Sequence, residues 1–147
     1  MEESLKNPEI LRQIILDNYQ YPNNKGLVED DRYKKIHMAS DSCIDDLFIQ
    51  VLIEDDMIKD VRFDGVGCAI STASTSIISE LIKGKSVNDA KNIINEYYKM
   101  VDNQEADYDI LEEAYAFVNV GKQANRIKCA TIGINGMSSL IKEFEDE

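Results

Sequence analysis

The period of the hydrophobic pattern changes at one glycine-rich junction, and this change most limits the folds open to the chain. Residues 47–53 and 57–66 are rich in β-branched and aromatic side chains and flank a short acidic segment, which predicts a β-hairpin. Apolar residues then follow helical spacing over residues 70–81. Cys68, in the stretch FDGVGCAIS, is therefore predicted at a strand-to-helix junction.

Apolar residues recur at helical spacing in other parts of the chain as well. The further predicted helices are residues 8–20, 87–101 with Ser86 as N-cap, roughly 110–119, and 126–142. Residues 21–26 are dense in Pro, Asn and Gly and predict a loop, and most of residues 27–40 is predicted to be irregular. The order of elements predicts an α+β fold, with a small antiparallel sheet of about three strands and helices packed on one face.

Size and charge restrict the class of protein and its partners. A chain of 147 residues with 44% hydrophobic side chains predicts one domain spanning residues 1–147. The net charge of -12 repels phosphate backbones, so we expect a basic protein surface as partner and no nucleic acid. No apolar run reaches the roughly 18 residues that span a bilayer, and the N-terminus is acidic and polar. We therefore expect a cytoplasmic protein that has no membrane partner.

The three cysteines lie at the ends of predicted elements. Cys43 precedes the first strand, Cys68 precedes a helix, and Cys129 is predicted in the first turn of the last helix. Their separations do not suggest a disulfide framework in a reducing compartment. Helix N-termini favour thiolates, which points to a shared functional site assembled by the fold. Because free cysteine is among the most buried residue types, core filling is the alternative.

Tetrahedral zinc would require a fourth ligand, and acidic residues near Cys43 are the nearest candidates. In an extended segment Cys43 and Asp45 point to the same side, whereas Asp46 points away. Asp45 is therefore the favoured ligand, and we expect Asp41 and Asp46 to be solvated. His37, the only histidine, is the second choice.

Several segments carry a family resemblance that composition does not supply. They are DNYQYPNNKG at 17–26, SCIDD at 42–46, VRFDGVGCAISTAS at 61–74, IKGKS at 82–86 and NRIKCAT at 125–131. In this order they resemble the SufU branch of the IscU/SufU family of iron–sulfur cluster assembly proteins. The long separation of Cys68 from Cys129 fits that branch, and Lys128 stands where an IscU scaffold would carry a histidine.

The resemblance implies an IscU/SufU-like fold with one Zn²⁺ bound by Cys43, Asp45, Cys68 and Cys129. Cys43 is also implied to be the sulfur acceptor. In the family's mechanism a SufS-type cysteine desulfurase forms a persulfide, a partner histidine replaces the acceptor cysteine on zinc, and that cysteine takes the outer sulfur. A downstream Suf cluster-assembly complex then receives this sulfur. Arg126 resembles the branch's arginine, which stabilises the freed thiolate or persulfide; the alternative is a surface cation at a helix start.

Three positions depart from the family pattern. Ile44 replaces the usual glycine after the first cysteine, which predicts a stiffer loop around Cys43. Ser40, Asp41 and Ser42 replace the usual N-P-T, and Asn18 stands where a histidine is common. None of these changes removes a predicted ligand.

Three functions are compatible with these residues. The first is a zinc-dependent sulfurtransferase that accepts sulfur on Cys43. The second is a scaffold that holds iron in a transient [2Fe–2S] cluster on the same ligands. The third is a structural zinc domain that only binds a partner. The missing histidine and the long gap before Cys129 favour the first.

Overall fold

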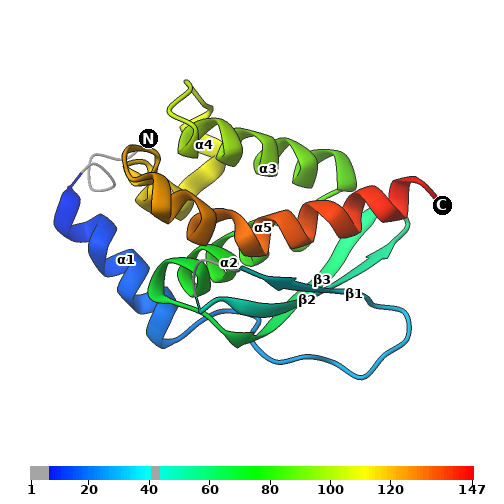
Figure 1. The fold of residues 1–147 in the computed structure, drawn as a ribbon. Helices are drawn as coiled ribbons and strands as arrows, with labels where there is room; N and C mark the ends of the chain where they lie inside the picture. Colours follow the sequence, from blue (N-terminus) through cyan, green and yellow to red (C-terminus); the bar gives the residue numbers. More distant parts are fainter. Residues whose placement is uncertain (1–6, 41–43) are drawn as a thin grey trace.

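Three antiparallel strands and a set of helices form the chain, whose computed structural model describes residues 7–40 and 44–147 (Figure 1). The strands are β1 (Lys34–Ala39), β2 (Asp46–Glu54) and β3 (Met57–Val66). The helices are α1 (Pro8–Gln20), α2 (Ala69–Ile82), α3 (Val87–Val101), α4 (Tyr108–Leu111) and α5 (Ala124–Glu145), with 3₁₀ segments η2 (Glu112–Phe117) and η3 (Val120–Lys122). The predicted α+β class with helices on one sheet face is confirmed.

The sheet has the order β1-β2-β3, and its central hairpin follows the prediction. Asp55 and Asp56 join β2 to β3, both with positive φ, as a tight hairpin turn requires. The register pairs Ile49 with Phe63, and both side chains are buried under the helices. This face of the sheet forms one wall of the hydrophobic core.

Strand β1 corrects the prediction that residues 27–40 are mostly irregular. Apart from Ala39 at its end, only Ile36 and Met38 supply apolar side chains in this strand, and they alternate with the exposed Lys35 and His37. Two apolar positions are too few to reveal a period of two. β1 is an edge strand, in which exposed lysines are common because they discourage pairing with another chain.

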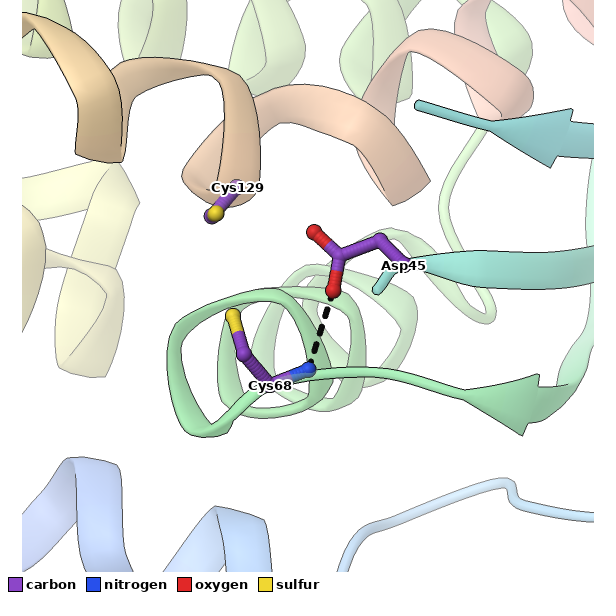
Figure 2. Close-up of side chains that lie close together, drawn as sticks. All are labelled: Asp45, Cys68 and Cys129. Carbon is purple, nitrogen blue, oxygen red and sulfur yellow. Dashed lines mark hydrogen bonds between the residues drawn. The ribbon is translucent and has the colours of Figure 1, made fainter. Parts of the chain in front are cut away.

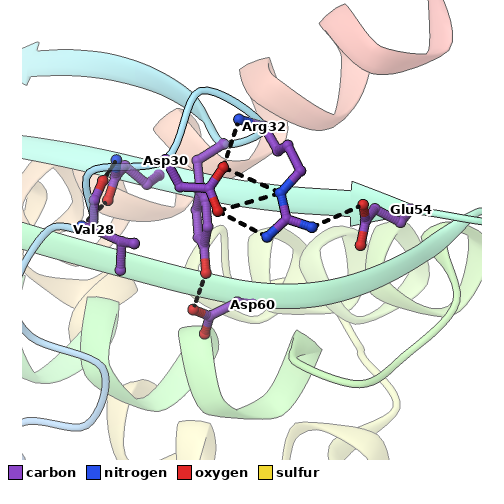
Figure 3. A network of polar contacts seen from close by, with 7 residues as sticks. Val28, Asp30, Arg32, Glu54 and Asp60 are labelled. Carbon is purple, nitrogen blue, oxygen red and sulfur yellow. Dashed lines mark hydrogen bonds and ion pairs between the residues drawn. The ribbon is translucent and has the colours of Figure 1, made fainter.

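The loop between α1 and β1 covers the sheet face opposite the helices. The Gln50 side chain donates to the Val28 carbonyl and accepts from the Val28 amide, both at 2.8 Å. Tyr33 donates its hydroxyl to Asp60 at 2.6 Å, and burial followed by this hydrogen bond raises the pKa of Tyr33 to about 12. Arg32 forms ion pairs with neighbouring acidic side chains (Figure 3). Polar contacts therefore fasten this loop to the sheet.

Helix α2 is buried over most of its length although it is rich in serine and threonine. The hydroxyls of Ser74 and Thr75 donate to the Ser71 carbonyl at 3.2 and 2.7 Å. Ser76 donates to the Asn18 side chain of α1 at 2.8 Å. Because these hydroxyls are bonded inside the protein, the small side chains can be buried without leaving polar groups unsatisfied. Other elements can then approach α2 closely.

Two glycines inside α5 explain how that helix packs. A Cβ on Gly133 would lie 2.0 Å from Thr75 Oγ1 of α2, and one on Gly136 would lie 2.9 Å from Ile49 Cγ1 of β2. Both residues reduce helix propensity, yet the predicted helix 126–142 is confirmed and extends further at both ends. Because glycine has no side chain at these two positions, α5 can pack closely against α2 and the sheet.

The remaining predicted elements agree with the structure apart from one segment. The helices expected at 8–20 and 87–101 are confirmed, and Ser86 caps α3 by accepting from the Asp89 amide. The stretch expected at roughly 110–119 begins earlier as α4 and continues as 3₁₀ turns. None of the helices that the structure describes is long and apolar enough to cross a bilayer.

We predict that Gly133→Ala destabilises the protein. The added Cβ meets Thr75 Cβ and Cγ2 as well as its hydroxyl, so rotation of Thr75 cannot relieve the overlap. Overpacking of about 1–3 kcal/mol should exceed the helix-propensity gain of about 1 kcal/mol, giving a lower free energy of unfolding in a urea titration. Ser139→Ala on the exposed face of α5 is the control and should change stability by less than about 0.5 kcal/mol. An unchanged or higher stability for Gly133→Ala would contradict this packing.

Candidate metal centre

Asp45, Cys68 and Cys129 come together from three separate elements at one end of the sheet (Figure 2). One carboxylate oxygen and the two Sγ atoms all lie within 4.8 Å of one another. Asp45 immediately precedes β2, Cys68 is the N-cap of α2, and Cys129 belongs to α5. The fold thus gathers residues that are far apart in the sequence.

The Asp45 side chain is buried, with 1% of its surface exposed, and is bonded to the start of α2. Its Oδ1 accepts from the Cys68 amide at 2.9 Å and from the Ser71 hydroxyl at 2.7 Å. Its backbone carbonyl accepts from the Ser40 amide at 3.2 Å. A carboxylate at a helix N-terminus bonds amides that lack partners within the helix, and the macrodipole favours its charge. These bonds compensate for its burial.

Two glycines allow the backbone turn that places Cys68. Gly65 has φ +121°, and a Cβ there would lie 2.2 Å from the Asp46 carbonyl oxygen. A Cβ on Gly67 would lie 2.6 Å from Ser71 Oγ. Cys68 itself is half-buried, and its Sγ accepts from the Ser71 amide at 3.4 Å. The glycines before this cysteine therefore serve the close approach of α2 to the sheet.

Cys129 lies further into its helix than the sequence predicted. Because α5 begins at Ala124, Cys129 belongs to the second turn, and the prediction of a first-turn position is wrong. The electrostatic effect of a helix N-terminus falls off within the first turn, so it does not act on this thiol. Cys129 Sγ lies 4.0 Å from the Asn125 carbonyl oxygen. Its position beside Cys68 comes from helix packing.

A cleft of about 720 Å³ opens beside the two cysteines. It is lined by Cys68, Ala69, Ile70, Ala124, Asn125, Arg126, Lys128 and Cys129. Arg126 and Lys128 are exposed, and they bring positive charge to the cleft in a chain whose net charge is -12. These two cations are the charged side chains among the residues that line the cleft.

The other candidate ligands lie outside this group or outside the described residues. Cys43 and Asp41 belong to residues 41–43, which the structure does not describe. Asp46 is exposed and pairs with His37, whose ring stacks on Phe48 at a centroid distance of 4.5 Å. Neither Asp46 nor His37 belongs to the group formed by Asp45 and the two cysteines.

The donor chemistry of the group fits a zinc ion. Two thiolates and one carboxylate are ligand types that Zn²⁺ accepts, and a tetrahedral site needs one more. Ser71 was not among the site residues predicted from the sequence, although it contacts Asp45 and Cys68. Its position three residues after the N-cap of α2 was the available signal, since side chains there commonly take part in capping.

Known proteins share sequence and fold with this chain. Residues 10–142 match the NifU-like N terminal domain family. The zinc-dependent sulfurtransferase SufU of Bacillus subtilis strain 168 is 35% identical over 137 residues, which cover 92% of each chain. The iron–sulfur cluster assembly scaffold protein IscU of Streptococcus pyogenes serotype M1 is 32% identical over 130 residues, 88% of this chain and 80% of the other.

Solved structures give the same result. A candidate iron–sulfur cluster assembly scaffold protein for the SUF system, from Fervidobacterium islandicum AW-1, superposes with a TM-score of 0.75 at 27% identity, covering 86% of this chain and 92% of that one. A hypothetical protein solved at 2.3 Å superposes with a TM-score of 0.85 at 29% identity, covering 92% and 99%. The family model spans most of the chain and the relatives span nearly all of it, so the resemblance seen in the sequence is confirmed. The chain belongs to the NifU-like N terminal domain family, among the SufU- and IscU-like proteins of iron–sulfur cluster assembly.

Proposed function

We propose that this protein is a zinc-dependent sulfurtransferase of iron–sulfur cluster assembly. It accepts persulfide sulfur from a SufS-type cysteine desulfurase on Cys43 and passes it to a downstream Suf cluster-assembly complex. The observation that carries the proposal is the close approach of the Asp45, Cys68 and Cys129 ligand atoms, all within 4.8 Å of one another. The similarity to the Bacillus subtilis protein named as a zinc-dependent sulfurtransferase supports it.

In this proposal Asp45, Cys68 and Cys129 hold one zinc ion together with Cys43. Cys43 is two positions before Asp45 in the chain, which makes it the natural fourth ligand. Bound zinc keeps cysteine thiols deprotonated at neutral pH. The protein's own contribution is to hold the ligands in place: a helix N-cap supplies Cys68, α5 supplies Cys129, and hydrogen bonds orient Asp45.

The sulfur transfer is a thiol–disulfide type of exchange. The Cys43 thiolate attacks the outer sulfur of the desulfurase persulfide and forms a new S–S bond with it. The bond between the two donor sulfurs breaks, and its electron pair leaves with the desulfurase cysteine as a thiolate. No external oxidant or reductant is consumed. Arg126 and Lys128 at the cleft supply positive charge that stabilises the thiolate and the anionic persulfide.

A cluster scaffold is the second candidate function. The relative from Streptococcus pyogenes is named as a scaffold, and thiolate ligands also hold [2Fe–2S] clusters. Bound iron, with visible absorbance in protein purified without oxygen, distinguishes it from the colourless zinc protein. A purely structural zinc domain is the third, and it would bind zinc without ever forming a persulfide on Cys43.

The purified protein is predicted to contain one zinc per chain. Replacing Cys43, Asp45, Cys68 or Cys129 with Ala should each lower the zinc content, because each change removes one ligand. Asp46→Ala is the matched control: it removes the neighbouring carboxylate, which is exposed, and should leave zinc content unchanged. Elemental analysis measures all five variants beside the unmodified chain. Unmodified protein that binds no metal would contradict the site, and iron with visible absorbance would place the scaffold first.

Cys43 is predicted to carry the transferred sulfur. After incubation with a SufS-type desulfurase and free cysteine, intact-mass measurement should find one added sulfur atom, and peptide mapping should assign it to Cys43. Cys43→Ala should not form this adduct, because no acceptor thiol remains. For the same reason it should not increase the turnover of the desulfurase, as the unmodified protein is expected to do. Circular dichroism of the same variant checks that the helices are retained. An adduct on Cys68 or Cys129, or none on the unmodified chain, is the opposing result.

Arg126→Ala is predicted to slow transfer without releasing zinc. Loss of one charge-assisted contact of about 1.4 kcal/mol corresponds to a roughly tenfold lower rate. Lys122→Ala, a cation outside the lining of the cleft, is the control and should leave the rate unchanged. Single-turnover sulfur transfer and zinc content are measured on both variants. Equal transfer rates for Arg126→Ala and the unmodified protein would show that Arg126 is a surface cation with no part in sulfur transfer.

A further inference from the structure

We infer that Ser71 is a positioning residue of the metal centre, whose buried hydroxyl holds the Asp45 carboxylate in the orientation that presents its second oxygen to the metal. The inference rests on the proposed function only in taking Asp45 and Cys68 as metal ligands. Ser71 itself is not a ligand candidate, because the usual zinc ligands are cysteine, histidine and carboxylate side chains. It acts through the residues that bind.

Ser71 contacts two of the ligand candidates, Asp45 and Cys68, from the first turn of α2. It has no exposed surface, and its hydroxyl donates to Asp45 Oδ1 at 2.7 Å. The Cys68 carbonyl at 3.2 Å and Cys68 Sγ at 3.5 Å also lie within reach of this hydroxyl. A hydroxyl has one proton, and the ionised carboxylate at the shorter distance is the stronger acceptor. The Ser71 amide donates to Cys68 Sγ at 3.4 Å, so one residue steadies two ligands.

The two hydrogen bonds to one carboxylate oxygen define how Asp45 is turned. Oδ1 accepts from the Cys68 amide and from the Ser71 hydroxyl. Figure 2 shows the other oxygen on the side of Cys129, away from the Cys68 amide. With Oδ1 held by two donors, the carboxylate is oriented so that its second oxygen lies on the side of Cys129. Hydrogen bonds of this kind to ligating carboxylates tune metal affinity in proteins generally.

Among the neighbouring buried serines, the position of the Ser71 hydroxyl differs in its contacts. A Cβ on Gly67 would lie 2.6 Å from Ser71 Oγ, so the glycine leaves the room that the hydroxyl occupies. Ser74, one turn further along α2 and equally buried, donates instead to a carbonyl of its own helix at 3.2 Å. Ser71 and Ser74 thus provide a matched pair of buried serines, of which only the first contacts the proposed metal ligands.

The test compares zinc affinity in Ser71→Ala and Ser74→Ala by competition with chromophoric chelators of graded strength. Ser71→Ala should bind zinc about 10–100-fold more weakly, the usual effect of removing such a supporting hydrogen bond. Ser74→Ala should bind as the unmodified protein does. Thermal unfolding of the metal-free proteins is followed in parallel, so that a general loss of stability is recognised as such.

A double-mutant cycle with Asp45→Asn separates positioning from a merely structural role. Asn keeps an oxygen that both donors can reach and replaces the metal-facing oxygen with an amide nitrogen, which does not bind zinc. Adding Ser71→Ala to Asp45→Asn should therefore lower zinc affinity no further. Equal losses in both backgrounds would show that Ser71 acts on the fold and not through Asp45.

The outcomes distinguish this inference from the proposed function. Zinc binding by Ser71→Ala equal to that of the unmodified protein overturns the inference and leaves the zinc site intact. No zinc binding by the unmodified protein, or no loss in Asp45→Asn, overturns the site itself. If Ser71→Ala does not fold, Ser71→Thr and Ser71→Val replace it, since they share a shape and differ in the hydroxyl. Ser71→Thr should bind zinc about 10–100-fold more tightly than Ser71→Val. Equal zinc affinities of these two variants would reject the role of the hydroxyl.

Discussion

The candidate site depends on the hydrogen bonds between the buried Asp45 carboxylate and the start of α2. This carboxylate lies where β2 begins and bonds the first turn of α2, so it joins the sheet to the central helix. Burying a carboxylate is costly unless hydrogen bonds replace its water, and here the helix N-terminus supplies them. The same bonds that make this burial tolerable also set the direction of the carboxylate and the position of the Cys68 amide.

Close packing brings the third residue to this point. α2 presents small hydroxyl side chains whose protons are used inside the protein, and α5 presents glycine where it meets Thr75. The two helices approach closely for this reason, and Cys129 comes beside Cys68 without any local sequence motif that links them. The group of Asp45, Cys68 and Cys129 is thus a consequence of how the core is packed, which is why the spacing of the cysteines could not reveal it.

Much of the fold could be predicted from the sequence where periodicity was strong. The hairpin and the helices α1, α2 and α3 have long apolar patterns with clear end signals, whereas β1 has two large apolar residues and could not be recognised. Alternation along an extended segment favoured Asp45 over Asp46, and the structure has Asp45 buried beside the cysteines and Asp46 exposed. The turn of α5 that carries Cys129, and the role of Ser71, depend on helix starts and contacts that a sequence pattern does not contain.

A residue that both binds a metal and accepts sulfur has to leave one role to perform the other. In the proposed function that residue is Cys43, and the remaining ligands must then keep the site together without it. Asp45 is buried and doubly hydrogen-bonded, Cys68 caps α2, and Cys129 belongs to a packed helix. All three are held by contacts that do not involve a metal. In the proposed function, three ligands that are held by the framework suit a site that exchanges sulfur on Cys43 while retaining its ion.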